Sequence, residues 1–336
     1  MRALDAHIPT SSHMQRRILL ALAAGAALTL PAYAQTAWPT RPVRIVVPAP
    51  AGSSLDIIVR LLGDKLKDRW AQPVVVENKP GAGGMIGMDA AAKAAPDGHT
   101  MAIGFNGPIA FAPFMYTKTP YDPAKDLVPV VMTTSQPNVL AINANVPAKT
   151  VKEFVDWAKA QGGKMNYSSL GKGSSAHLTM ELFLAEAGIT ATHIPFNGSP
   201  PAATAVAQGE AHGTFMVAPA LLSHVQAGKV RMLAVSSRER PAALKELPTL
   251  AEAGYGAVES LAWNGLFVPA GTPVAVVEKI NADVNAALND PGVRSALDNQ
   301  GLTPVGGSAA DFRRTVETDM KRWGAIIQRI GLKIEQ

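Results

Sequence analysis

Strand and helix patterns alternate along the chain, and this alternation constrains the fold more than any other feature. A β-branched run at Val43–Val47 ends at Pro48, and residues with helical apolar spacing follow it. The same succession then repeats, which predicts strands at 43–47, 74–76 and 100–104, a helix opening at Gly52-Ser53-Ser54, and a helix over 84–95. A β-α-β-α-β order of this kind predicts an α/β fold with a parallel sheet and helices on both of its faces.

A second α/β cycle begins near residue 139. It predicts five strands and four helices: strands at 139–142, 165–168, 193–196, 214–217 and 230–235, and helices at 150–160, from 175, at 200–208 and at 219–227. After a strand at 263–268, the helices near 273–289, 291–299 and 308–330 have no strand to alternate with, so we expect them on the outside of the first unit. The pattern predicts two lobes joined by a hinge around a central cleft: lobe 1 from 38–138 plus 261–336, and lobe 2 from 139–260.

The first 34 residues have the pattern of a secretory signal peptide. A positive segment, an apolar run too short to span a bilayer and an A-x-A cleavage site follow one another: Gln15-Arg16-Arg17, Ile18–Leu30 and Ala32-Tyr33-Ala34. We expect residues 1–34 to be removed and the mature protein to be periplasmic. A start at Met14 is an alternative that would leave residues 1–13 outside the protein.

The residue content excludes several classes of function. The sequence has no Cys, which excludes disulfides, thiolate metal sites, a Cys nucleophile and a lipid-modified N-terminal Cys. The net charge is +5, but no block of Lys and Arg accompanies it, so we expect no nucleic-acid partner. Beyond the leader no apolar run reaches ~18 residues, so we expect a soluble mature protein.

The loop Pro48–Asp56 is the first candidate binding segment. It connects the first strand to the first helix, at the carboxyl end of a parallel strand, where open α/β sheets bind ligands. Free N–H groups and the dipole at a helix start form an anion site. The candidate residues are Ala51, Gly52, Ser53, Ser54 and Asp56. An ordinary N-cap explains the same residues equally well.

The loop Ser168–His177 mirrors the first segment in the other lobe. It is not a phosphate loop, because Gly173 directly follows Lys172 and the G-x-x-x-x-G-K-[ST] spacing is absent. The candidate residues are Ser168, Ser169, Gly171, Gly173 and Ser174, with Ser174 as the N-cap. We interpret His177, one turn into the helix, as structural.

Nothing in the chain indicates a cofactor or a catalytic set. The segment Asn78–Gly87 contains G-x-G-x-x-x-G, which differs from the dinucleotide fingerprint, and its glycines are better explained by tight packing of a helix on a strand. The motifs G-x-S-x-G and H-E-x-x-H are absent. We therefore expect no cofactor, no metal and no enzymatic activity.

A series of ordered segments resembles the Bug family, the periplasmic receptors associated with tripartite tricarboxylate transporters. The resemblance runs from about residue 38 to the C-terminus and rests on segments 38–48, 75–84, 96–100, 121–127, 173–181, 193–198, 233–235, 247–250, 263–266 and 269–273. It implies a bilobal, type II-like periplasmic binding protein that closes on a small carboxylate and delivers it to integral membrane transporter subunits. It also implies ligand contacts from Asn106, Phe196 and Asn197, together with the two loops above. We expect the protein to act as a monomer.

The sequence departs from the family pattern at several positions. Ala49 stands where the family usually has an aromatic residue, and Gly52-Ser53 stands in place of a Gly-Gly pair. Ala205 and His212 occupy two places where an acidic residue is frequent, which argues against a ligand with an ammonium group. These departures favour a roomier site for an aromatic acid or a longer dicarboxylate. A periplasmic signalling partner and a periplasmic enzyme are the alternative functions.

Overall fold

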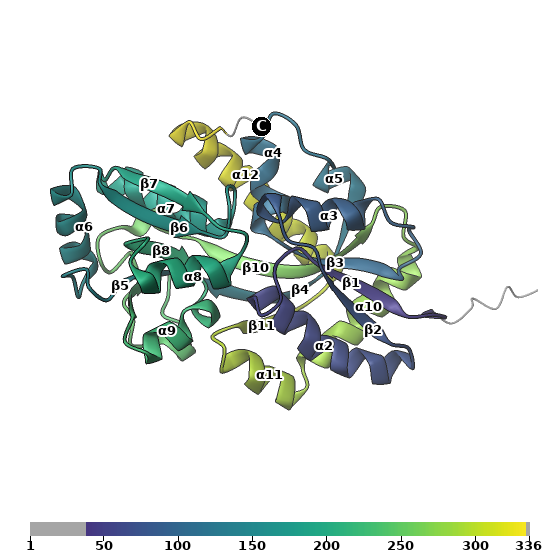
Figure 1. Cartoon of the computed structure of the whole chain (residues 1–336). Helices are drawn as coiled ribbons and strands as arrows, with labels where there is room; N and C mark the ends of the chain where they lie inside the picture. The colour runs from purple at the N-terminus through teal and green to yellow at the C-terminus, as the bar shows by residue number, and fades with distance from the viewer. Residues whose placement is uncertain (1–37, 334–336) are drawn as a thin grey trace, which may run out of the picture. The chain divides into compact units, whose positions relative to one another are not determined.

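The chain folds into two β-sheets, and helices cover both of them (Figure 1). The computed structural model describes residues 38–333, so the predicted signal peptide at 1–34 lies outside the described residues. From Arg41 onward the chain forms one compact unit. Within residues 38–333, no helix is both long enough and apolar enough to cross a bilayer.

The first sheet has six strands in the order β11-β4-β10-β3-β1-β2. Their bounds are β1 Val43–Val47, β2 Val74–Asn78, β3 Thr100–Phe105, β4 Leu127–Pro137, β10 Leu261–Pro269 and β11 Thr303–Gly306. β1 pairs in parallel with both β2 and β3, which confirms the parallel prediction for these three strands. β10 is antiparallel to both β3 and β4, and β11 is antiparallel to β4, so the sheet as a whole is mixed.

The second sheet has five strands in the order β7-β6-β8-β5-β9. Their bounds are β5 Val139–Asn143, β6 Met165–Ser169, β7 Ala191–Pro195, β8 Gly213–Met216 and β9 Val230–Val235. β6 is parallel to β7 and β8, whereas β5 is antiparallel to β8 and β9. In both sheets, therefore, three parallel strands lie beside an antiparallel strand, and the chain enters that antiparallel strand directly from the other sheet. We call each sheet with its helices a lobe.

Helices follow the first two strands of each parallel trio. In the first lobe the helical segments are α2 Ser54–Trp70, η1 Ala82–Gly84, α3 Met85–Ala92, the π-helix η2 Gly107–Phe111, α4 Ala112–Met115, α5 Pro123–Asp126, α10 Val274–Leu288, α11 Pro291–Asp298 and α12 Ala309–Ile330. In the second they are α6 Val151–Ala160, α7 Ser175–Ala187, α8 Ser199–Gln208, η3 Ala218–Ala220, α9 Leu222–Gln226, η4 Ala242–Leu244 and η5 Gly256–Val258. α2 and α7 occupy equivalent places, each directly after the first strand of its trio.

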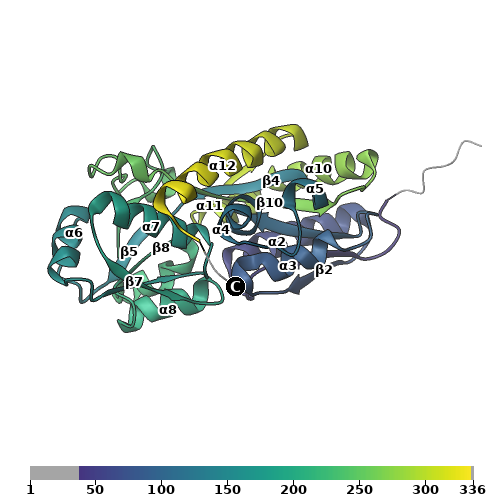
Figure 2. The ribbon, with the colours of Figure 1, turned by 90° about the horizontal axis from the view of Figure 1, so that it is seen from above.

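The C-terminal part differs from the sequence prediction in one respect. A short strand, β11, lies between α11 and α12, so the last helices do alternate with a strand. α10 and α12 pack on the first lobe as expected, against β4. α12 also reaches α7 of the second lobe, where Arg329 lies 3.2 Å from Glu186 (Figure 2).

The second lobe differs from the sequence prediction in two smaller respects. β7 begins at Ala191, and the predicted 219–227 helix is divided into η3 and α9.

A buried polar network joins the two places where the chain crosses between lobes. Asn138, between β4 and β5, donates its backbone N–H to Ser236 Oγ (2.9 Å) and its amide to Ser260 Oγ (3.2 Å). Thr179 of α7 donates to Ser260 Oγ over 2.8 Å. All four residues are buried. The network therefore ties the β4–β5 crossing to the segment between β9 and β10.

Candidate ligand-binding site

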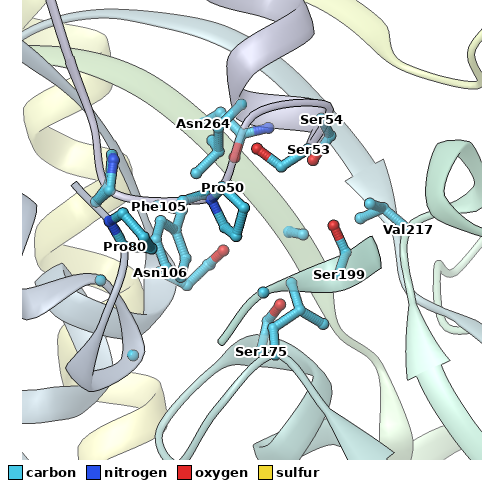
Figure 3. Close-up of a pocket in the computed structure, with 18 of the residues that line it drawn as sticks. Pro50, Ser53, Ser54, Pro80, Phe105, Asn106, Ser175, Ser199, Val217 and Asn264 are labelled. Atoms are coloured by element: carbon cyan, nitrogen blue, oxygen red, sulfur yellow. The ribbon is translucent and has the colours of Figure 1, made fainter. Parts of the chain in front are cut away.

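A pocket lies between the two lobes and is bounded on a third side by the crossing strands (Figure 3). About 640 Å³ of space free of protein atoms lies within it, including the part that opens to solvent. Its lining residues are Pro48, Ala49, Pro50, Ser53, Ser54, Leu55, Pro80, Gly81, Gly83, Gly84, Phe105, Asn106, Gln136, Leu170, Ser175, Asn197, Gly198, Ser199, Val217, Ala262 and Asn264.

Three helices begin at this pocket. Ser54, Ser175 and Ser199 are the first residues of α2, α7 and α8, and all three line the space. Figure 3 shows Ser54 on one side and Ser175 and Ser199 on the opposite side. The first N–H groups of a helix have no partner within the helix, and the helix dipole makes this end positive. One helix end from the first lobe and two from the second therefore bring positive potential to one space.

The described lining contains no charged side chain. Its polar side chains are serines, asparagines and one glutamine, and the remaining residues are apolar or glycine. Attraction of an anion to this pocket must therefore come from main-chain N–H groups, hydroxyls, amides and helix dipoles.

In the first lobe, Asp56 organises the loop before α2. Its carboxylate accepts hydrogen bonds from Gly52 N (3.0 Å), Asn78 Nδ2 (3.0 Å) and Arg60 Nε (2.9 Å). Burial raises the pKa of Asp56, but these three donors outweigh burial and hold the pKa below its ordinary value. Gly52 has φ +78°, which favours glycine. Asp56 is thus a buried anion that lies outside the pocket lining and holds the loop in place through its hydrogen bonds.

In the second lobe, the loop before α7 is held by its own residues. Ser174 Oγ donates to Gly171 O (2.8 Å) and accepts from His177 N (3.3 Å), and Gly173 N donates to His177 Nδ1 (3.1 Å). Ser169 Oγ lies 2.6 Å from His193 Nε2. The hydroxyls and N–H groups of this loop are therefore largely committed to internal hydrogen bonds.

The imidazoles behind this loop are neutral at physiological pH. His177 and His193 stack with ring centroids 4.1 Å apart, and His193 stacks on Tyr167 at 4.8 Å. Burial, with a smaller contribution from His193 and Lys172, lowers the pKa of His177 to about 3. Burial and Lys172 lower the pKa of His193 to about 4.

Asn106 links the pocket wall to the C-terminal helix. Its Oδ1 accepts from Trp263 N (3.0 Å), and its Nδ2 donates to Asp319 Oδ2 (2.6 Å) and Leu261 O (3.2 Å). Asp319 also accepts from Trp263 Nε1 over 2.7 Å. Burial raises the pKa of Asp319, although these donors partly oppose burial. The Asn106 side chain is thus engaged in positioning β10, where the chain re-enters the first lobe.

The two lobes touch around the pocket. Tyr116 OH donates to Lys172 O over 3.2 Å. A Cβ at Gly198 would lie 2.5 Å from Pro50, and a Cβ at Gly83 would lie 2.6 Å from Lys172 O. Both glycines have positive φ, and both allow the lobes to approach more closely than any side chain would permit. Of the glycines in the 78–87 segment, Gly83 thus faces the second lobe, whereas Gly84 and Gly87 pack against residues of the first lobe.

The sequence-predicted residues fall into two groups. Four of them line the pocket: Ser53, Ser54, Asn106 and Asn197. The others lie outside its lining: Ala51, Gly52, Asp56, Ser168, Ser169, Gly171, Gly173, Ser174 and Phe196. Ala49 lines the pocket, whereas Ala205 is buried in α8 outside the lining.

Sequence reasoning missed Ser175, Ser199 and the residues of the crossing strands. Pro200 and Pro201 mark the first turn of α8, so they could have identified Ser199 as a helix start. Gln136, Ala262 and Asn264 come from β4 and β10. Gln136 pairs with Ala262 in the antiparallel ladder, and Thr134 pairs with Asn264, so these four side chains share one face of the sheet.

Comparisons with known proteins identify the family. The family described as "Tripartite tricarboxylate transporter family receptor" matches residues 58–332. Rpa4515 of R. palustris, solved with adipate, is 34% identical with a TM-score of 0.86, over 89% of this chain and 100% of that one. MatC (Rpa3494) of Rhodopseudomonas palustris, solved with bound malate, is 30% identical with a TM-score of 0.82, over 86% and 100%.

A third solved structure is described as the periplasmic binding protein BugD. It is 28% identical with a TM-score of 0.83, over 89% of this chain and 100% of that one. These similarities confirm the bilobal α/β fold and the resemblance to the Bug proteins, and two of the three solved relatives hold a carboxylate. This chain therefore belongs to the family of tripartite tricarboxylate transporter receptors.

Proposed function

We propose that this protein is a periplasmic receptor that captures a small organic carboxylate by closing its two lobes and delivers it to membrane transporter subunits. The observation that carries the proposal is the convergence of three helix N-termini, at Ser54, Ser175 and Ser199, on a pocket whose described lining holds no charged side chain. Such a site favours an anion with oxygen acceptors. It gives an ammonium group no carboxylate partner.

The strength of such a site can be estimated from its donors. A hydrogen bond to a charged group contributes ~1.5–3 kcal/mol, and micromolar affinity requires ~8 kcal/mol. Four or five donors divided between the lobes would suffice after the ordering cost of closure. The adipate and malate of the solved relatives support a dicarboxylate. Ala49, in place of a larger residue, leaves room for an aromatic acid or a longer dicarboxylate.

Closure follows from the division of the donors. One helix end belongs to the first lobe and two belong to the second, so only the closed arrangement brings all three to one ligand. A ligand then stabilises the closed state, because that state makes contacts which the open state lacks. We place the lobes at 38–138 plus 261–336 and at 139–260, with the bend at the Asn138–Ser260 network.

The cellular role rests on the leader and the family. The signal-peptide pattern of residues 1–34 supports export, and the family description supports a transporter as partner. We infer that the receptor works as a monomer and without catalysis. In support of the latter, the described pocket lining offers no Asp, Glu, His, Lys or Cys to act as general base or nucleophile.

A ligand screen tests the proposal. Purified protein without its leader is screened by thermal shift and then by calorimetry against aliphatic dicarboxylates, aromatic acids and amino acids. We expect at least one carboxylate to bind stoichiometrically without turnover and to raise Tm. Ser175→Ala should weaken that ligand about tenfold, because a donor to the anion is lost. Ser223→Ala, at an exposed serine of α9, is the matched control and should leave affinity unchanged. Binding of amino acids alone, or equal effects of the two variants, would refute the proposal.

A further inference from the structure

Gln136 is a buried amide with an unsatisfied oxygen at the wall of the pocket. It lies near the end of β4, is 2% exposed and lines the pocket. Its Oε1 is buried and has no hydrogen-bond partner within the described part of the chain. A buried polar atom without a partner costs about 1–3 kcal/mol, so its presence calls for an explanation.

The surroundings of Gln136 offer space and a fixed neighbour. Ala262 lies directly opposite on β10 and contributes only a methyl group. Asn264 is on the same sheet face. Its amide donates to Thr134 Oγ1 over 2.9 Å, so the Asn264 side chain is turned toward β4. The terminal torsion of a glutamine is broad, so the Gln136 amide can turn either its oxygen or its nitrogen toward the pocket.

This wall differs from the walls at the helix ends. Ser54, Ser175 and Ser199 lie at positive helix termini and suit a carboxylate. Gln136 lies on the crossing strand two residues before Asn138, and it brings a neutral amide. A ligand whose carboxylate is bound at the helix ends therefore meets Gln136 with another of its groups.

We infer that Gln136 makes the site select hydroxylated carboxylates over the corresponding acids that lack the hydroxyl. This inference rests on the proposed function of the same pocket. A hydroxyl both donates and accepts, so it can donate to Oε1 while accepting from Nε2. A carboxylate or keto group only accepts, so it leaves Oε1 unsatisfied. An ammonium group only donates, and the described lining gives it no anionic partner.

The test compares acids of equal chain length that differ by one hydroxyl. The pairs are malate with succinate, 2-hydroxyglutarate with glutarate, and 3-hydroxyadipate with adipate, each hydroxy acid as separate enantiomers. Calorimetry measures Kd for the wild type, for Gln136→Met and for Gln226→Met, a control at an exposed glutamine of α9. At the chain length that binds, we expect one hydroxy acid to bind the wild type about tenfold more tightly than its parent.

In Gln136→Met the same ratio should fall to within about twofold, while Gln226→Met should keep the wild-type ratio. The ligand-free Tm of Gln136→Met should equal or exceed that of the wild type, because an unpaired buried polar group is replaced by an apolar chain of similar length. Equal affinity of the wild type for both members of every pair overturns the inference and leaves the proposed function standing. A lowered ligand-free Tm in Gln136→Met also overturns the inference, since it would show that the Gln136 amide stabilises the folded protein in the absence of a ligand. Failure of every acid to bind the wild type overturns the proposed function itself.

Discussion

The loops that precede α2 and α7 have the same frame and different charges. Gly52-Ser53-Ser54-Leu55-Asp56 and Gly173-Ser174-Ser175-Ala176-His177 each follow the first parallel strand of a lobe. In each, the first serine caps the helix and the last residue accepts a hydrogen bond from the N–H of the glycine, over 3.0 Å in the first loop and 3.1 Å in the second. The second serine faces the pocket in both.

The accepting residue sets the charge that each lobe brings to the ligand. Asp56 is an anion, compensated by Arg60 and by neutral donors, whereas His177 accepts the same hydrogen bond as a neutral ring. The second lobe also contributes α8 to the pocket. A capping serine alone therefore does not determine how strongly a helix start attracts an anion. The residue three positions after the capping serine, Asp56 or His177, decides whether a negative charge offsets the positive end of the helix dipole. We therefore expect the second lobe to attract the carboxylate more strongly.

The largest effect should come from giving the second loop the residue of the first. His177→Asp places a carboxylate in a position that is 4% exposed, with Glu181 nearby and with Lys172, in place of a hydrogen-bonded arginine such as Arg60, as the neighbouring cation. We expect the free energy of unfolding to fall by about 3 kcal/mol or more, since the buried charge has no hydrogen-bonded ion-pair partner to offset its burial. Urea unfolding at neutral pH measures this loss.

The control for that substitution is His177→Asn. The Asn side-chain oxygen can take the place of Nδ1 as acceptor for Gly173 N, so the main loss is the ring stacking on His193 and Tyr167. We expect a cost of about 1 kcal/mol. Equal losses in the two variants would show that charge is not what distinguishes the loops.

The second-largest effect should be a difference in how the two loops make stability depend on pH. The pKa of His177 is about 3 in the folded protein and about 6.5 when unfolded, so between these values the unfolded chain binds the proton and the folded chain does not. Stability is therefore complete above pH 6.5 and falls as pH decreases toward 3. Asp56, whose pKa is lowered, keeps its stabilising contribution above its unfolded pKa of 3.8 and loses it only in stronger acid.

Denaturation curves from pH 7.5 to 4.5 measure this difference. The wild type should lose stability across this range through His177 and His193, on the order of 2–3 kcal/mol for each. His177→Asn should lose about half as much, because His193 still titrates. A slope identical to that of the wild type would contradict the assignment of the buried neutral ring to His177.

The sequence allowed prediction of the elements whose patterns are local. The strand 43–47 and the helices α2, α7 and α12 follow from apolar periodicity and capping serines. The strand β4 was missed, because Pro129 and Pro137 and a polar Thr-Thr-Ser-Gln stretch argue against a central strand. It is a strand nevertheless, since Pro129 pairs with Phe267 at a register shift, where a missing N–H disturbs the ladder least.

The candidate site was predictable at the start of α2 but not at its third wall, which the crossing strands form. Ser53 and Ser54 carry a local signal, and the loop before α7 was placed correctly on the chain. What sequence could not show is that the hydroxyls of Ser169 and Ser174 are used within their own loop. It also could not show Gln136, since pairing of β4 with β10 joins residues more than a hundred positions apart. Such pairings depend on the register of the whole sheet.

The smallest effect tests the compensation of Asp56 in the first lobe. Arg60 is half exposed and bonds Asp56 Oδ2, so Arg60→Ala leaves the carboxylate with the neutral donors Gly52 N and Asn78 Nδ2. The carboxylate then opposes an anion at the start of α2 more strongly. We expect the Kd for the bound acid to rise about twofold to threefold at low salt, because the interaction is partly screened by solvent.

Lys67→Ala provides the matched control on the same helix. Lys67 also forms an exposed ion pair, with Asp64, but it lies 11 residues beyond Asp56, or ~16 Å along the axis. It should leave the Kd unchanged. The Arg60→Ala effect should disappear near 1 M salt, where the Debye length is about 3 Å. If both variants weaken binding equally, net charge explains the result; if neither does, the charge of Asp56 does not reach the ligand, and the two loops are electrostatically equivalent despite their different residues.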